Sequence, residues 1–152
     1  MVMPAEHSIP KEGRVMEHNP HNPHKQQSVL FQTSKQKGNW AENIACQWLV
    51  KQGLTLKQKN FYTRYGEIYL IMSDSLQLIF FEVKYRKNNY FGTAEASITQ
   101  QKCRRLTAAV ETYLLINNYG NNQPLRFDAV TVVPAREAHL NCTINWIKNI
   151  LS

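Results

Sequence analysis

The sequence lacks any apolar run long enough to cross a membrane, because a spanning helix needs about 20 consecutive apolar residues and the 152 residues contain no such run. The N-terminus also lacks the apolar core of a signal peptide. Cysteine is scarce: Cys46, Cys103 and Cys142 are odd in number, lie far apart and show no zinc-binding spacing. We therefore expect a cytoplasmic protein with reduced thiols and no membrane partner.

Acidic residues are also scarce. The chain has 11 Asp and Glu residues against 18 Lys and Arg residues, for a formal net charge of +7. From Gly38 onward the imbalance persists, with thirteen basic and eight acidic residues. A basic balance favours a polyanionic partner, although charge alone does not separate nucleic acid from a membrane surface or from mere solubility.

The first 37 residues have almost no periodic apolar pattern and are rich in His, Pro, Asn and Gln. Such a segment buries too little apolar surface to offset the entropy of ordering it, so residues 1–37 are predicted to be a flexible polar extension. His18, His21 and His24 are spaced like metal ligands, but a polar tail explains them more simply. Residues 38–152 suit a single domain with one core.

Beyond Gly38 the apolar pattern predicts regular structure. Apolar residues recur at helical spacing from Trp40 to Leu49, and later segments alternate as strands. The order predicts an α/β (α+β) fold with a central mixed β-sheet flanked by helices. The expected elements are a helix ending near residue 53, an extended segment over 54–62, strands over 66–71 and 76–85, a helix over 94–116, and strands over 125–133 and 140–146.

The strand over 76–85 carries an acid and a base two positions apart. Since side chains alternate across a strand, Glu82 and Lys84 project from one face, about 6 to 7 Å apart. Alone, such a pair is most often an incidental ion pair on a solvated face. Glu67 and Tyr69 share a face of the preceding strand, and a hairpin loop with an even number of residues brings all four side chains together, whereas an odd loop separates them. The sequence leaves this choice open.

Three residues on the predicted helices have two readings each. Glu42 lies at the edge of the apolar stripe of the first helix, where it is either exposed or faces a pocket. Lys102 and Arg105 fall within the apolar sector of the long helix. They either extend past the core into water or reach the hairpin carboxylates or a bound phosphate.

The acidic residues and the lysine suit one chemistry. Two or three carboxylates that hold Mg²⁺ can neutralise a phosphoryl group and activate water, while a nearby Lys orients that water or offsets developing charge. Glu42, Glu67, Glu82 and Lys84 are the residue types that phosphodiester hydrolysis needs. A few acidic residues surrounded by basic ones is also the charge distribution expected of a site that binds both a metal ion and a nucleic acid.

These residues belong to an ordered set of short motifs. The set comprises Gly38 with Ala41-Glu42, Asn60, Gly66-Glu67-Ile68, Phe81-Glu82-Val83-Lys84 with Arg86, Phe91-Gly92, Lys102, and Arg126-Phe127-Asp128. In order and spacing it resembles the YraN-like family of small bacterial proteins, from roughly residue 38 to the C-terminus. The resemblance implies the restriction-endonuclease-like fold of the PD-(D/E)XK nuclease superfamily, near the archaeal Holliday-junction resolvases. It also implies a divalent-metal site, for Mg²⁺ or Mn²⁺, and a branched or duplex nucleic acid as substrate, with DNA favoured over RNA.

Carried over position by position, the resemblance makes Glu42 the helix-borne acid, Glu82 the second strand acid and Lys84 the motif lysine. Glu67 matches the Glu of the family's Gly-Glu-Ile-Asp motif. The family's principal metal-binding aspartate corresponds here to Tyr69, whose phenol is neutral near pH 7 and is a poor ligand for Mg²⁺. The leading hypothesis is therefore a nucleic-acid-binding protein of nuclease-type fold whose metal site is degraded or rearranged.

Two alternatives stay open. One is an active Mg²⁺- or Mn²⁺-dependent endonuclease, with Glu42, Glu67 and Glu82 as metal ligands and with Lys84, Glu82 and Glu67 in catalysis. The other is a non-enzymatic protein-interaction module, including a homodimer, for which the basic charge serves only solubility. The residues expected to contact nucleic acid are Arg64, Arg86, Lys87, Lys102 and Arg105.

Overall fold

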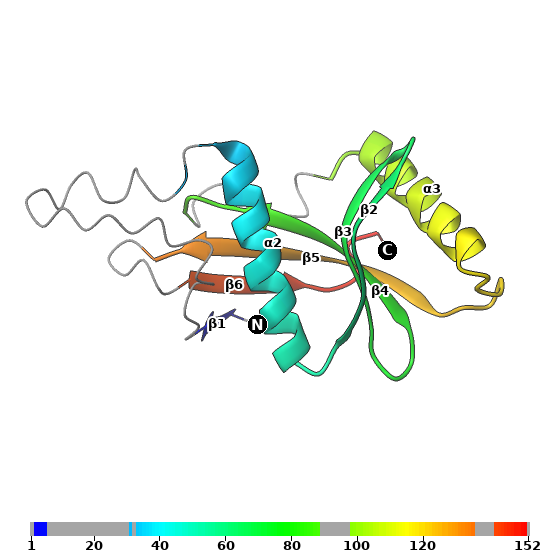
Figure 1. Cartoon of the computed structure of the whole chain (residues 1–152), viewed down its shortest axis with the longest axis horizontal. Coiled ribbons are helices and arrows are strands. Elements are labelled where there is room, and N and C mark those ends of the chain that lie inside the picture. The colour runs from blue at the N-terminus through cyan, green and yellow to red at the C-terminus, as the bar shows by residue number, and fades with distance from the viewer. Residues whose placement is uncertain (1, 6–30, 32, 89–97, 136–141, 152) are drawn as a thin grey trace, which may run out of the picture.

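The computed structural model describes residues 2–5, 31, 33–88, 98–135 and 142–151 (Figure 1). Within these residues, three consecutive strands separate the two helices, and the elements form a single α+β arrangement. The elements are β1 (Val2–Ala5), α2 (Ser34–Lys51), β2 (Thr55–Thr63), β3 (Gly66–Ser73), β4 (Leu78–Tyr85), α3 (Gln100–Ile116), β5 (Leu125–Pro134) and β6 (Cys142–Ile147).

Among the described residues, the strands form one six-stranded sheet in the order β1-β6-β5-β4-β3-β2. β4 and β5 run parallel, and the other neighbouring strands run antiparallel. Because two parallel neighbours start at the same end of a sheet, the chain must cross back between them, and α3 lies within this crossover. The predicted mixed sheet flanked by helices is confirmed.

The two helices cover opposite faces of the sheet. α2 crosses the sheet on one side, and α3 lies beside β2 and β3 (Figure 1). On β4, Ile79, Phe81 and Val83 pack into the core beneath α2, whereas Leu78 and Phe80 pack into the core beneath α3. A strand that is buried on both faces reads as a continuous apolar run, which explains why this part of the sequence does not alternate.

The start of α2 is set by its N-cap. The Thr33 hydroxyl accepts a hydrogen bond from Gln36 N at 3.1 Å, and Gln36 Oε1 accepts one from Thr33 N at 3.1 Å. Together these bonds satisfy two helix-end donors as a capping box. The helix therefore begins at Ser34, ahead of the domain start expected at Gly38.

The N-terminal extension contains an element that its sequence did not predict. Val2–Ala5 forms the edge strand β1, paired antiparallel with β6. Because β1 and β6 are more than a hundred positions apart in the sequence, no local pattern could predict that they pair. The other residues of the predicted extension up to the N-cap, 6–30 and 32, lie outside the described residues, as do the three histidines that we considered as metal ligands.

The long helix begins later than predicted. We expected α3 to start at residue 94, but α3 starts at Gln100. Thr99 is the N-cap, and its hydroxyl accepts a hydrogen bond from Lys102 N at 3.1 Å. Residues 94–97 lie outside the described residues. The later start places Lys102 in the first turn of the helix.

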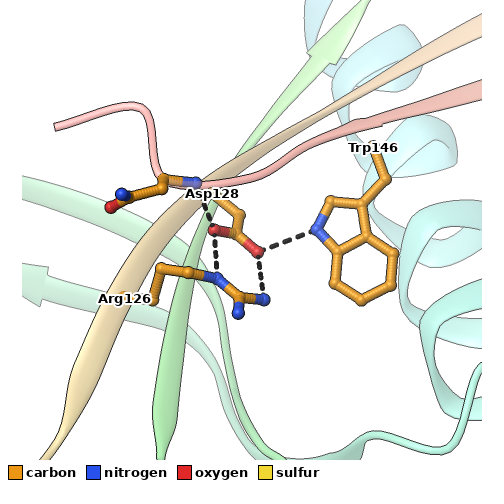
Figure 2. A network of polar contacts seen from close by, with 4 residues as sticks. Arg126, Asp128 and Trp146 are labelled. Atoms are coloured by element: carbon orange, nitrogen blue, oxygen red, sulfur yellow. Dashed lines mark hydrogen bonds and ion pairs between the residues drawn. The ribbon is translucent and has the colours of Figure 1, made fainter. Parts of the chain in front are cut away.

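A buried carboxylate joins β5 to β6 and the residues that follow it (Figure 2). The Asp128 side chain is fully buried. Its Oδ1 accepts hydrogen bonds from Arg126 Nε and from the backbone N of Asn149, both at 2.8 Å. Its Oδ2 accepts from Arg126 Nη2 at 2.9 Å and from Trp146 Nε1 at 2.8 Å. A carboxylate with four donors is compensated for its loss of water.

We expect Asp128→Ala to destabilise the protein by about 3 to 5 kcal/mol, because it leaves the Arg126 guanidinium and two further donors without their buried partner. Urea unfolding followed by circular dichroism measures the change. The matched control is Glu111→Ala on the exposed face of α3, for which a change within about 0.5 kcal/mol is expected. Equal unfolding midpoints for both variants would contradict a structural role for Asp128.

Candidate functional site

The candidate site lies where β3 leaves β4. The ladder between these strands runs from the pair Ser73 and Leu78 to the pair Leu70 and Phe81, and then stops. β3 continues to pair with β2 as far as Gly66. A pocket of about 320 Å³, here called the fork pocket, lies beyond the end of the ladder, between β3, β4 and the first turns of α3. The sequence-predicted residues that line it are Glu67, Tyr69, Glu82, Lys84, Lys102 and Arg105.

The hairpin loop decides which side chains meet there. Ser73 pairs with Leu78, so residues 74–77 form a four-residue loop. Asp74 stabilises this turn, since its Oδ1 accepts hydrogen bonds from Leu76 N at 2.8 Å and Gln77 N at 2.9 Å. The even loop is the case in which the predicted acids, the tyrosine and the lysine share one patch, and the structure confirms it.

Glu82 is at the centre of the fork pocket. Its side chain is only 5% exposed, and its Oε1 lies 2.9 Å from Lys84 Nζ and 2.6 Å from Lys102 Nζ. Of the two readings of Lys102, the structure supports the one in which it reaches a hairpin carboxylate. Burial acts to lower the pKa of Lys84, but the contact with Glu82 outweighs burial and raises that pKa. A single buried negative charge therefore faces two ammonium groups.

Tyr69 stands beside these charges as a neutral group. Its half-buried ring lines the fork pocket and also packs against the core beneath α2. Burial raises the pKa of the Tyr69 phenol, and the negative charges of Glu82 and Glu67 raise it further. The phenol thus stays protonated across the neutral pH range.

Glu42 lies on α2 and does not line the fork pocket. Burial, followed by the charge of Glu67, raises the pKa of Glu42 to about 7; Lys59 opposes the shift and Glu82 adds to it. The carboxyl group is half-buried. Glu42 therefore fits neither reading fully, because it is partly buried but does not line the fork pocket.

The predicted basic residues separate into two groups. Lys102 and Arg105 line the fork pocket from α3. Arg64 lies in the turn between β2 and β3, next to a pocket-lining residue. Arg86 and Lys87 follow β4 and do not line the pocket, and Arg86 N donates a backbone hydrogen bond into the sheet at 3.0 Å. The structure therefore brings part of the predicted basic set to the pocket.

Other pocket residues escaped the sequence analysis. Thr99, Gln101 and Tyr65 also line the fork pocket. The first two would have been found if Thr99 had been read as an N-cap, because threonine is a preferred residue at that position. Tyr65 gave no periodic signal, since it lies in a tight turn.

The acids do not form a metal cluster of ordinary geometry. The described residues contain no set of three histidine, cysteine, aspartate or glutamate side chains close enough to share one metal ion. In the same part of the chain, no helix is both long and apolar enough to cross a membrane.

The protein is a small α+β domain, consistent with the restriction-endonuclease-like architecture. It has a mixed sheet with a helix on each face and a fork pocket of acids and lysines between two strands. The chain belongs to the uncharacterised protein family UPF0102, whose family model matches residues 41–132. The matched range includes every predicted site residue. The resemblance to the YraN-like family is thereby confirmed.

Individual relatives match more than three quarters of the chain. A UPF0102 protein of Pseudoalteromonas translucida is 41% identical over 121 residues, which is 80% of this chain and 94% of the relative. A UPF0102 protein of Nitrosococcus oceani is 42% identical over 117 residues, 77% of this chain and 92% of the relative. One of Nitrosomonas eutropha is 43% identical over 117 residues, 77% of this chain and 94% of the relative.

The raised pKa of Glu42 predicts a pH-dependent stability. Because its pKa is about 7 in the folded protein and 4.5 ordinarily, the folded state binds this proton more tightly than the unfolded chain. The resulting stability is fully present below pH 4.5 and is lost as the pH rises through 7. We expect Glu42→Gln, which carries no ionisable group, to be more stable than wild type above pH 7. For a half-exposed group screened by solvent, the gain is on the order of 1 kcal/mol.

Unfolding midpoints at pH 4.5 and at about pH 8 would measure this difference. The matched control is Glu111→Gln, the same substitution at an exposed site on α3. If Glu42→Gln differs from wild type by the same amount at both pH values, the raised pKa is wrong.

Proposed function

We propose that this protein binds nucleic acid at the fork pocket, and that two lysine ammonium groups take the place of the divalent cation of a nuclease-type site. The observation that carries the proposal is the pairing of Glu82 Oε1 with Lys84 and Lys102, at 2.9 and 2.6 Å. The carboxylate expected to hold a metal already has its counter-charge from the protein itself.

The side chains at the fork pocket do not fit Mg²⁺ or Mn²⁺. These ions select carboxylate, carbonyl and water oxygens. The strand position that corresponds to the family's metal-binding aspartate carries the neutral Tyr69 instead. Glu42 does not line the fork pocket, so it adds no third carboxylate there. A divalent cation near Glu82 would also be repelled by the ammonium groups of Lys84 and Lys102.

The charge balance of the fork pocket favours an anion instead. Lys84, Lys102 and Arg105 outnumber Glu67 and Glu82 among its lining residues. The N-terminus of α3 also meets the pocket and has no acidic residue in its first turn. The positive end of the helix dipole therefore adds to the potential. Phosphate groups of a nucleic-acid backbone suit this arrangement, and the guanidinium of Arg105 can bind one through two parallel hydrogen bonds.

Metal-dependent cleavage is the second candidate function. One observation favours it: the charges of Glu67 and Glu82 both raise the pKa of Glu42, so the three acids predicted as ligands interact electrostatically, although they are not close enough in this structure to share one metal ion. In that case Glu67 replaces the aspartate missing at Tyr69, and Lys84 acts beside the metal. The two ammonium groups on Glu82 favour the binding function over cleavage.

Arg105 tests the binding function best, because Lys102 also holds Glu82 in place. For DNA tested both as a single strand and as a duplex, we expect Arg105→Gln to weaken affinity by about 5- to 30-fold and to reduce the slope of log K against log salt by about one. Fluorescence anisotropy at several salt concentrations measures both quantities. The matched control is Arg104→Gln, which changes the neighbouring exposed arginine that does not line the fork pocket. Salt-insensitive binding, no binding, or equal losses in both variants would each refute the proposal.

A further inference from the structure

We infer that the nucleic acid bound at the fork pocket presents unpaired bases, which stack on the two tyrosines of the β2–β3 hairpin, Tyr62 and Tyr65. The inference rests on the proposed function and adds to it the class of substrate: a single strand, or a duplex with a single-stranded arm.

Tyr62 is an exposed aromatic side chain beside the pocket. It is 71% exposed, although aromatic rings contribute most to stability when they are buried. Tyr62 pairs in register with Glu67, which lines the fork pocket. Because side chains of directly paired residues project from the same face of the sheet, the Tyr62 ring lies next to Glu67 and the pocket while remaining open to solvent.

Tyr65 forms the rim of the pocket itself. It lines the fork pocket and is 37% exposed. The Arg64 guanidinium lies over the Tyr65 ring, with Cζ 4.7 Å from the ring centroid, and donates a hydrogen bond to the Tyr65 hydroxyl. Guanidinium planes and tyrosine rings are the surfaces on which proteins stack unpaired bases, and arginine can also pair with the adjoining phosphate.

The turn between the two tyrosines is held in one conformation. The Thr63 hydroxyl accepts hydrogen bonds from Tyr65 N at 3.1 Å and Gly66 N at 3.2 Å, and donates one to Gly66 O at 3.0 Å. Gly66 has a φ of 152°, a backbone conformation that residues other than glycine rarely adopt. Because the turn is ordered before binding, little entropy is lost when a ligand stacks on it.

The combination favours unpaired over paired bases. In a duplex the base faces are stacked on one another and only their edges are accessible, so exposed rings gain nothing from them. In a single strand the base faces are accessible, and each nucleotide carries one base and one phosphate. The cationic fork pocket can then hold the backbone while the adjoining tyrosines hold the bases.

The experiment compares three DNA probes of equal strand length: a single strand, a blunt duplex, and a duplex with two single-stranded arms. Fluorescence anisotropy gives the affinity of wild type, Tyr62→Ala and Tyr65→Ala for each. We expect each variant to lose about 5- to 100-fold in affinity for the single strand and the armed duplex, with little change for the blunt duplex. Tyr62→Phe keeps the ring and should retain most of the wild-type affinity. Leu76→Ala, at a 77% exposed apolar site in the distal turn of β3 and β4, is the matched control.

The outcomes separate this inference from the proposed function. Equal affinity for all three probes, with no selective loss in the tyrosine variants, would overturn stacking while the binding function stands. Losses as large in Tyr62→Phe as in Tyr62→Ala would also overturn it, because the hydroxyl and not the ring would then matter. Failure of wild type to bind any probe would remove both.

Discussion

The burial of Glu82 is the constraint on which the fork pocket depends. A carboxylate with a 5% exposed side chain needs charged partners, and here they come from its own strand and from a helix far along the chain. Lys102 thus joins the first turn of α3 to β4. Removal of either ammonium group would leave the buried Glu82 carboxylate less well compensated. This would destabilise the protein more than the loss of an ion pair on the surface. In the proposed function, the contact that assembles the pocket also takes the place of a metal ion.

A second buried carboxylate shows what a purely structural arrangement looks like in the same sheet. Asp128 is fully buried and receives four hydrogen bonds from within the protein (Figure 2). It lines no part of the fork pocket. Glu82 differs because its ammonium partners lie at a pocket wall, where a ligand can meet them. The Arg126-Phe127-Asp128 motif therefore supports the fold, and the strand that carries Glu82 and Lys84 supports the site.

Local patterns were sufficient for much of the fold. Alternation placed Glu82 and Lys84 on one face, and helical spacing located α2 and most of α3. The patterns could not reveal the hairpin register, because a four-residue and a five-residue loop fit the same turn residues, nor the partner of Lys102, which depends on how α3 packs. β1 was missed because its pairing with β6 is remote in sequence. The pKa of Glu42 follows from burial, which exists only in the folded chain.

The central claim is that lysine ammonium groups, and not a divalent ion, neutralise Glu82. Calorimetric titration of Mn²⁺ into the purified protein tests it most directly. We expect no saturable binding to wild type, and binding to the double variant Tyr69→Asp with Lys102→Met, which adds a carboxylate and removes an ammonium group. One-site binding to wild type that Glu82→Gln abolishes would contradict the account.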